Sequence, residues 1–480
     1  ALFLALLLWK KMPLLQTSVI TLAVTAFLAY SYWKIFPDFL TASFIKGTLV
    51  ALDIFIIILG AILFLETIKG LKIIEGISYH LEKISKDYRV QVIILAWFFE
   101  SFLEGTAGFG VPAAVVAPIL IGLGIAPLKA VIIALLGNSA PGIFGAAGTP
   151  IRIGFEGLNI SGIAETAVWI NLIGIIVPVA ILWVLTGGRQ DRKKHFIEAL
   201  PFAIWSGIAF LVPSIFILPL GQEFPSIIGP VIGMALVILT SKLGIFMPKN
   251  TRRALDAPKQ KTDLSFFKSS LPYILLIVFL IAGKFLLSGI ILPIKFGEVS
   301  HSFNLFNPGF AFILTAILIG LFWNSKKNPM IKSFAVSAKR SFAPFAVIAC
   351  MSAFVQIMLF AGQNQTGFQS PIFLISKIFE TQFLPFWSPF VGAFGSFLTG
   401  SVTISNIMFG NFLSVASLAL GIVSVKILAL ALVGASAGNM IALADILSAE
   451  SVVGLKNKER HVLKGVAIPC LVYVAIAGII

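Results

Sequence analysis

Long apolar runs, separated by short polar or basic segments, fill almost the whole chain. A helix needs about 20 apolar residues to cross a bilayer, and such runs recur at Leu14–Trp33, Gly47–Leu65 and Ala164–Leu185. A segment charged with both signs, Lys69–Arg89, is typical of an interfacial or cytoplasmic helix. With one span in about 35 to 40 residues, the pattern predicts an all-α, polytopic helical membrane protein with about 12 to 14 spans.

The longest polar stretch, Lys249–Lys268, divides the predicted spans into two groups. Its basic residues, like those of the other short loops, are placed as the positive-inside rule expects for cytoplasmic loops. We therefore expect a first half at residues 1–248, a cytoplasmic linker at 249–270 and a second half at 271–480. The later spans are predicted near Pro201–Leu220, Pro225–Phe246, Pro272–Leu292, Pro308–Trp323, Ser341–Phe360, Pro371–Phe379, Pro389–Leu398 and Val462–Ile480.

The segment Glu100–Pro112, ESFLEGTAGFGVP, places two carboxylates inside an apolar region. Ionisable groups in hydrocarbon are costly, and by default they mark a functional site. The Gly and Pro residues that follow break a helix, and broken helix is tolerated at membrane depth only against protein or a water-filled cavity. We interpret this segment as half of a binding site that the rest of the chain encloses.

Further segments share this loop chemistry of Gly, Pro, Ser, Thr and Asn within an apolar context. Gly137–Pro150 reads GNSAPGIFGAAGTP, and comparable segments lie near 399–411 and 434–445. Together with the break near 100–112, they predict discontinuous helices or hairpins at the membrane midplane.

The breaks are related by an internal repeat. SFLEG at Ser101–Gly105 matches SFLTG at Ser396–Gly400, with an offset of 396 − 101 = 295. LLGNSAPG at Leu135–Gly142 resembles LVGASAGN at Leu432–Asn439, with an offset of 432 − 135 = 297. Paired, interrupted apolar segments in two halves indicate a transporter's binding site. We expect two inverted repeats, which would require an odd number of spans in each.

The carboxylates suggest proton chemistry. Glu100 and Glu104 are four residues apart, so they share a face of a helix. Two carboxylates this close in a low-dielectric region are not expected to ionise together, which would let one carry a proton. Glu104 is favoured because it lies at the break, and Asp445 lies near the last break. The alternative is that one or both face the interface or are neutralised by a basic partner.

The second half has Gly395 and Thr399 at the positions that match the two glutamates, followed by hydroxyl and amide side chains. Helix N-termini bind anions through free N–H groups, so a small carboxylate suits these breaks. The alternative is that the hydroxyls satisfy broken backbone or join helices, and that Arg152 extends to the interface. The candidate substrate-binding residues are Thr106, Gly108, Gly110, Asn138, Ser139, Arg152, Ser401, Thr403, Ser405, Asn406, Ser436 and Asn439.

Composition excludes several classes of protein. The chain of 480 residues is 58% hydrophobic and 11% charged, which indicates a membrane protein, and its net charge of +15 reflects the basic loops rather than nucleic-acid binding. Cys350 and Cys470 lie in apolar runs and indicate no disulfide. The scattered histidines show no metal spacing, and no HExxH motif occurs, so we expect no metal, no cofactor and no enzyme activity. The opening run, ALFLALLLW, fits either the end of a first span or a cut signal-like segment.

Several motifs resemble the bacterial lactate permease family. They are FLEGTAGFGVPAAVVAPILIGLG at Phe102–Gly124, SFLTGSVTISNIMFGN at Ser396–Asn411, SAGNMI at Ser436–Ile441 and VVGLKNKERHVLK at Val452–Lys464. The chain departs from the family's usual pattern at Thr106, Val111, Val402 and 442–445, as a divergent member would. The resemblance implies a multi-pass protein of the bacterial inner membrane that takes up L-lactate, D-lactate or glycolate with protons.

The resulting expectation is a secondary transporter that imports a short 2-hydroxy monocarboxylate by proton symport and alternating access. A sodium-coupled carrier, or a carrier of dicarboxylates or other small organic anions, is the alternative, because broken helices with exposed carbonyls also bind sodium. The expected partners are the organic anion, protons and the lipid bilayer, and the sequence leaves a homodimer open.

Overall fold

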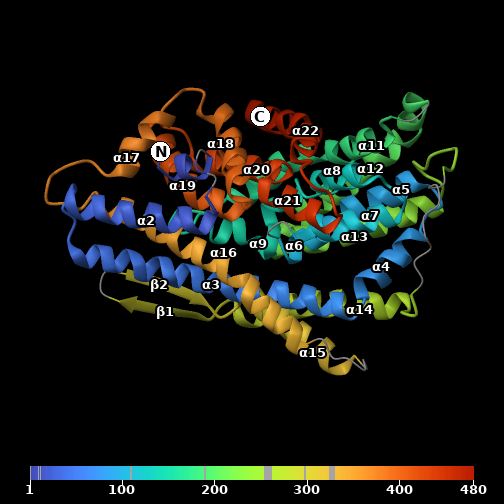
Figure 1. Ribbon diagram of the computed structural model, residues 1–480, viewed down its shortest axis with the longest axis horizontal. Helices are drawn as coiled ribbons and strands as arrows, with labels where there is room; N and C mark the ends of the chain where they lie inside the picture. The colour runs from blue at the N-terminus through green and yellow to red at the C-terminus, as the bar shows by residue number, and fades with distance from the viewer. Residues whose placement is uncertain are drawn as a thin grey trace.

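The computed structural model describes residues 2–8, 10, 12–108, 111–188, 191–252, 262–296, 299–323 and 330–480. Within these ranges, 10 helices are long and apolar enough to cross a membrane, and up to 11 if the bent pair Pro127–Gly137 and Pro141–Arg152 is one span (Figure 1). The range of about 12 to 14 expected from the length of the chain is higher than this count, which leaves out the shorter apolar helices at Pro112–Gly122 and Pro308–Phe322. The chain is therefore a polytopic helical membrane protein, as predicted.

The first part of the chain contains long helices followed by short, interrupted ones. Its elements are α1 (Leu2–Leu8), α2 (Leu14–Ser31), α3 (Pro37–Gly70), α4 (Ile73–Glu82), α5 (Tyr88–Ile93), the π-helix η1 (Ile94–Phe99), α6 (Glu100–Thr106), α7 (Val111–Gly122), α8 (Pro127–Gly137), the 3-10 helix η2 (Pro141–Phe144), α9 (Gly145–Arg152), α10 (Ile163–Ile170), the 3-10 helix η3 (Asn171–Ile176) and α11 (Val177–Thr186).

The middle of the chain supplies α12 (Arg192–Ile217), the 3-10 turn η4 (Leu218–Leu220), α13 (Pro225–Lys242) and α14 (Phe266–Leu287). Part of the predicted linker, residues 253–261, lies outside the described residues. The last part contains α15 (Pro308–Phe322), α16 (Met330–Phe360), α17 (Pro371–Ser376), η5 (Lys377–Phe379), α18 (Leu384–Thr399), α19 (Val402–Ala419), α20 (Ser424–Gly438), η6 (Asn439–Ile441), α21 (Leu443–Val452) and α22 (Glu459–Ile479).

A two-stranded antiparallel hairpin interrupts the helical chain, which the all-α prediction missed. It consists of β1 (Ile291–Phe296) and β2 (Val299–Asn304), with Ile294 opposite His301. The predicted span Pro272–Leu292 is wrong at its end, because α14 stops at Leu287 and the apolar residues that follow enter β1. β-branched and aromatic residues in this segment favour a strand, but an apolar run that continues a helix gives the same pattern.

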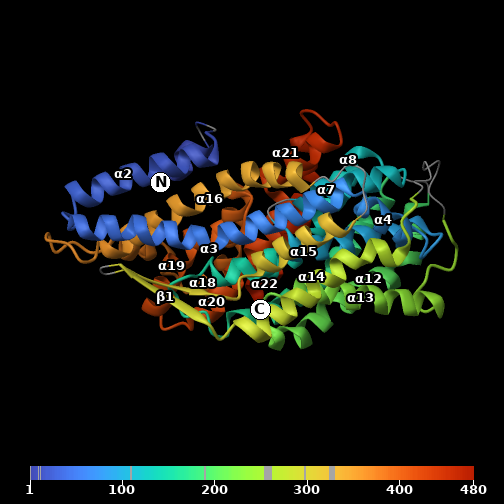
Figure 2. The ribbon, with the colours of Figure 1, turned by 90° about the horizontal axis from the view of Figure 1, so that it is seen from below.

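The long helices α3 and α16 run antiparallel along each other (Figure 2). A Cβ on Gly47 of α3 would lie 2.6 Å from the backbone nitrogen of Ala353 in α16, so glycine lets the two backbones approach closely. Farther along α3, Glu66 pairs with Arg340 of α16 at 2.7 Å. On the two flanks of this pair, α2 packs on α16 and α15 packs on α3.

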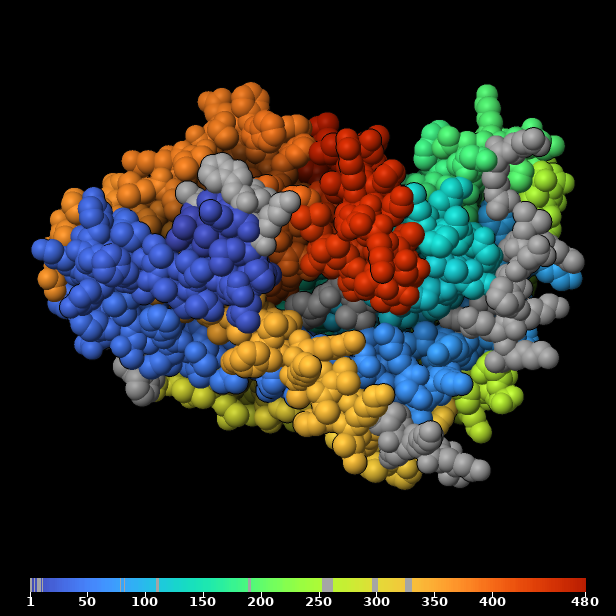
Figure 3. Space-filling model, in the orientation of Figure 1, coloured from blue at the N-terminus to red at the C-terminus, as the bar shows by residue number. Residues whose placement is uncertain are grey.

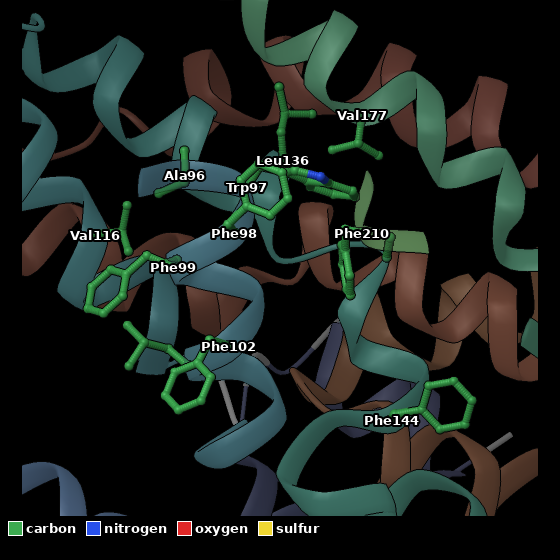
Figure 4. Packing of buried hydrophobic residues seen from close by; sticks show 14 of the residues in the cluster. Ala96, Trp97, Phe98, Phe99, Phe102, Val116, Leu136, Phe144, Val177 and Phe210 are labelled. Atoms are coloured by element: carbon green, nitrogen blue, oxygen red, sulfur yellow. The ribbon is translucent and has the colours of Figure 1, made fainter. Parts of the chain in front are cut away.

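Aromatic packing around Trp97 fixes the helix that leads to Glu100 (Figure 4). The indole Nε1 of Trp97 donates a hydrogen bond to the Ser206 carbonyl at 3.0 Å, and its ring meets Phe210 edge-on with centroids 5.2 Å apart. Ile94–Phe99 forms a π-helix, a widened turn that recurs at functional sites. The π-helix and its buried aromatic neighbours therefore hold α6 from one side.

Candidate functional site

Chain breaks from distant parts of the sequence meet around one small cavity. The breaks follow α6, α8, α18 and α20, and helices on either side of them pack together, including α7 with α21 and α9 with α19. Figure 3 shows the red surface of the C-terminal helices beside the cyan surface of the residues that follow the first break. The residues that line the cavity are Glu104, Gly108, Gly145, Ala146, Pro150, Gly400, Ser401, Val402, Thr403 and Asn439.

The first break places Glu104 at the cavity. α6 ends at Thr106, and Gly108 follows with a φ of +56°, a left-handed conformation that favours glycine. A Cβ on Gly105 would lie 2.3 Å from the Ser226 carbonyl, so α6 rests directly on the start of α13. The predicted site residue Gly110 lies outside the described residues.

The second break brings backbone close to the Glu104 carboxylate. Ala146 and Ala147 have φ values of +42° and +54°, so the chain turns sharply inside the segment that begins at Gly145. A Cβ on Gly145 would lie 2.6 Å from Glu104 Oε1. Glycine at this position therefore leaves room for the carboxylate, and Ala146 and Pro150 complete the same wall.

The third break opens the N-terminus of α19 toward the cavity. Gly400 has a φ of +68°, and the Ser401 side chain accepts a hydrogen bond from the Ile404 N–H at 3.3 Å as the N-cap. The N–H groups of Val402 and Thr403, in the first turn, have no partner among the described residues, and both residues line the cavity. The predicted break at 399–411 is too long, because regular helix resumes at residue 402 once Ser401 caps it.

The fourth break contributes Asn439. α20 continues through Gly434 to Gly438, so the break predicted near 434–445 begins later than expected. Gly434 serves packing instead, since a Cβ there would lie 1.9 Å from the Pro389 carbonyl of α18. Asn439 lines the cavity, and its Oδ1 has no hydrogen-bond partner among the described residues.

Three predicted acidic residues lie near the cavity without a basic partner in the described part of the chain. Glu104 is only 3% exposed, its Oε2 is unpartnered, and it interacts electrostatically with Asp445 of α21. Asp445 is likewise buried, with Oδ2 unpartnered. Glu100 is fully buried and both its oxygens are unpartnered, but it does not line the cavity. Buried carboxylates without a cation are costly when charged.

Several predicted substrate-binding groups bond to backbone instead of facing the cavity. Their oxygen or nitrogen atoms hold the breaks in shape, as the alternative interpretation of these hydroxyls and amides expected. The bonds are Thr106 Oγ1 to the Leu103 carbonyl, Ser139 Oγ to Leu136, Ser405 Oγ to Gly392, Asn406 Nδ2 to Pro150 and Ser436 Oγ to Ser139.

Asn138 and Arg152 occupy intermediate positions. The Asn138 amide is fully buried beside Glu104, but it lies outside hydrogen-bond geometry with any described group. Arg152 has two buried guanidinium nitrogens, Nε and an Nη, without a described partner, and it does not line the cavity. Sequence reasoning missed the lining residues Gly145, Ala146, Pro150, Gly400 and Val402. In the described ranges no cluster of His, Cys, Asp or Glu has the arrangement of a metal site.

Comparison with known proteins decides the family of this chain. The family model for L-lactate permease matches residues 1–292 and 284–480. The chain belongs to the L-lactate permease family. A putative L-lactate permease of Haemophilus influenzae is 31% identical over 430 residues, which cover 81% of this chain and 79% of that protein. The L-lactate permease of Salmonella typhi is 26% identical over 510 residues, 97% of this chain and 90% of its own length.

The family also includes relatives named for another 2-hydroxy acid. The glycolate permease of Escherichia coli is 26% identical over 454 residues, which cover 83% of this chain and 78% of the relative. As a lactate permease family member with many membrane-spanning helices, the chain is a multi-pass protein of the bacterial inner membrane and a permease rather than an enzyme. The resemblance inferred from the sequence motifs is confirmed.

Proposed function

We propose that this protein imports a short 2-hydroxy monocarboxylate, such as lactate or glycolate, by proton symport. The observation that carries the proposal is that the first-turn residues of α19, whose N–H groups are free, line the same cavity as Glu104, whose Oε2 is unpartnered. The N–H groups bind the anion, and the carboxylate binds the proton. Relatives named as lactate and glycolate permeases support this class of substrate.

The substrate's carboxylate fits the N-terminus of α19. The partial positive charge of a helix N-terminus and its free N–H groups favour an anion. The Thr403 hydroxyl and the Asn439 carboxamide lie on the same walls and can bond the 2-hydroxyl group. A metal ion is not needed for this mode of recognition, because the charge is met by backbone.

The proton is assigned to Glu104. An anion entering the cavity would meet the negative charge of an ionised Glu104 at close range, which is strongly unfavourable in a low-dielectric region. Protonation removes this repulsion, so the proton and the anion bind best together. Asp445, which interacts electrostatically with Glu104, is a further carboxyl group that can pass the proton on.

Alternating access is supported by the order of the helices. Residues 14–186 and 308–479 each contain the same order of elements. An apolar helix comes first, followed by a long helix, a short helix, two pairs of helices with a break inside each pair, and a last span. The long helices of the two stretches, α3 and α16, run antiparallel, as inverted repeats require. The boundaries of these two repeats differ from those of the halves expected at 1–248 and 271–480. The reason is that α12, α13 and α14 lie between the two repeats in the chain.

The test is uptake of labelled L-lactate, D-lactate, glycolate, acetate and malate into proteoliposomes that contain the purified protein. We expect an inward proton gradient to drive accumulation of the 2-hydroxy monocarboxylates, with no change when sodium is replaced by choline. Accumulation that requires sodium, or a preference for malate, would contradict the proposal in its coupling ion or its substrate.

A further inference from the structure

A second small polar pocket lies between α3, α16, α19 and the segment that follows α9. Its polar lining includes the side chains of Ser352, Gln356 and Asn411, which have no hydrogen-bond partner among the described residues. Polar side chains in the interior of a membrane protein are costly unless they bond to protein, water or a ligand. The pocket is therefore built to hold something that forms hydrogen bonds.

The pocket and the central cavity lie along one face of α19. Thr403 lines the cavity, whereas Ile407 and Asn411 line the pocket. These residues follow one another at intervals of four, so they form a single stripe on the helix. With a rise of about 1.5 Å per residue, Thr403 and Asn411 are about 12 Å apart along the helix axis. A small anion could pass from one site to the other along this stripe.

A cation-rich cluster borders the second pocket. Glu156 lines the pocket, and its Oε1 lies 2.9 Å from Lys46 Nζ and 3.0 Å from His301 Nδ1. Lys46 is four residues before Val50, another residue of the pocket wall, so both lie on the same face of α3. His301 comes from β2, and its Nε2 is buried without a hydrogen-bond partner in the described ranges.

Glu156 is the anion that this cluster holds. Burial acts to raise the pKa of Glu156, but hydrogen bonds and charge from His301 and Lys46 outweigh it and lower that pKa below its usual value. A carboxylate is thus bound by an ammonium group and an imidazole at the edge of a pocket with free amide and hydroxyl groups. The carboxylate of a free monocarboxylate can form the same hydrogen bonds with Lys46 and His301.

We propose that the second pocket is an access site for the transported monocarboxylate, in which the substrate displaces Glu156 from Lys46 and His301. This inference rests on the proposed function and adds a second binding position to it. Lys46 and His301 bind the carboxylate of the substrate, while Gln356, Asn411 and Ser352 bond its hydroxyl group. Glu156 competes with the substrate, so it keeps the site selective for anions that bind both Lys46 and His301.

The test is the KM of labelled L-lactate uptake in bacterial membrane vesicles from a host without its own lactate uptake. We expect Lys46→Gln to raise the KM about tenfold, the loss of one charged hydrogen bond, and Lys46→Arg to restore it in part. Asn411→Ala should raise the KM by roughly threefold. Glu156→Gln should lower the KM, because it removes the competing carboxylate. The matched control is Gln363→Ala, an exposed residue outside both sites, which should leave the KM unchanged.

Opposite changes in KM, a rise for Lys46→Gln and a fall for Glu156→Gln, distinguish an access site from a structural ion pair. A structural pair predicts that Lys46→Gln and Glu156→Gln impair uptake alike, and this result would overturn the access site while wild-type uptake still supports the proposed function. If Lys46→Gln fails to reach the membrane, an unchanged or raised KM for Glu156→Gln would overturn the access site by itself. A wild-type protein that takes up no 2-hydroxy monocarboxylate would contradict both proposals.

Discussion

The breaks after α6 and after α18 both contain a glycine with positive φ but differ in chemistry. Each helix is followed by a glycine with positive φ, Gly108 at +56° and Gly400 at +68°. At matching positions, Glu104 keeps an unpartnered oxygen, whereas the Thr399 hydroxyl donates to the Gly395 carbonyl at 2.8 Å and accepts from the Ser401 N–H at 3.2 Å. One break exposes a titratable group and the other exposes a capped helix N-terminus. The two breaks therefore offer different chemical groups to the cavity.

The largest effect is expected when the titratable group is removed from the first break. Glu104→Gln keeps the shape of the side chain but cannot exchange a proton at neutral pH. If one proton moves with one anion, a pH difference of about one unit supports about a tenfold accumulation, and we expect this variant to lose all of it. Uptake into proteoliposomes measures the loss, and exchange of labelled for unlabelled lactate without a pH gradient is the control. Accumulation equal to wild type would show that Glu104 carries no proton.

A smaller effect is expected at the third break, after α18. Ser401→Ala removes the N-cap of α19, which typically costs about 1 kcal/mol of helix stability, and it removes a hydroxyl from the cavity wall. We expect the KM for lactate to rise about tenfold or less while the accumulation ratio at saturation stays unchanged. Ser401→Thr, which retains the hydroxyl, should behave as wild type. A loss of accumulation without a change in KM would remove the distinction between the two breaks.

A variant of Glu100 tests whether the proton is carried by Glu104 alone or by both glutamates at the first break. It lies one helical turn before Glu104 but does not line the cavity. We expect Glu100→Gln to leave accumulation within about twofold of wild type, because a neutral amide replaces a buried carboxyl that has no cation to keep it ionised. The measurement is the same proteoliposome assay. If Glu100→Gln and Glu104→Gln abolish accumulation equally, the proton is shared by the pair rather than held at the break.

The smallest effect concerns a carboxylate with cationic partners, Glu156. Its pKa is lowered in the folded protein, since His301 and Lys46 outweigh burial, so its contribution to stability is present above the unfolded pKa of about 4.3. That contribution is lost as the pH falls through the folded pKa. We expect the Tm of wild type in detergent to fall more between pH 6 and roughly pH 3 than the Tm of Glu156→Gln. Parallel Tm curves would show that the cluster contributes no stability.

The sequence predicted the position of the breaks better than their internal geometry. Gly108 and Gly400 could be identified because glycine near proline or serine favours turns. The sharp turn at Ala146 and Ala147 has no such pattern, because alanine rarely adopts positive φ and tertiary contacts impose it here. The end of the break at Ser401 depends on a cap that only the structure resolves.

Contacts between distant residues were beyond sequence reasoning. Lys46, Glu156 and His301 are more than a hundred residues apart in sequence, and the histidines were given no role because they showed no common spacing. The hairpin that carries His301 was missed because its apolar first strand continues the pattern of α14. Pairing between remote segments leaves no periodicity that a single sequence can reveal.

Helices α19 and α20, in the second half of the chain, form hydrogen bonds with the backbone of the break after α8, in the first half. Asn406 of α19 donates to the Pro150 carbonyl at 2.9 Å, and Ser436 of α20 donates to the Ser139 carbonyl. A gene divided within residues 253–261 would therefore yield two fragments, neither of which completes its own binding site. Co-expression of the fragments should restore lactate uptake by complementation, whereas either fragment alone should not.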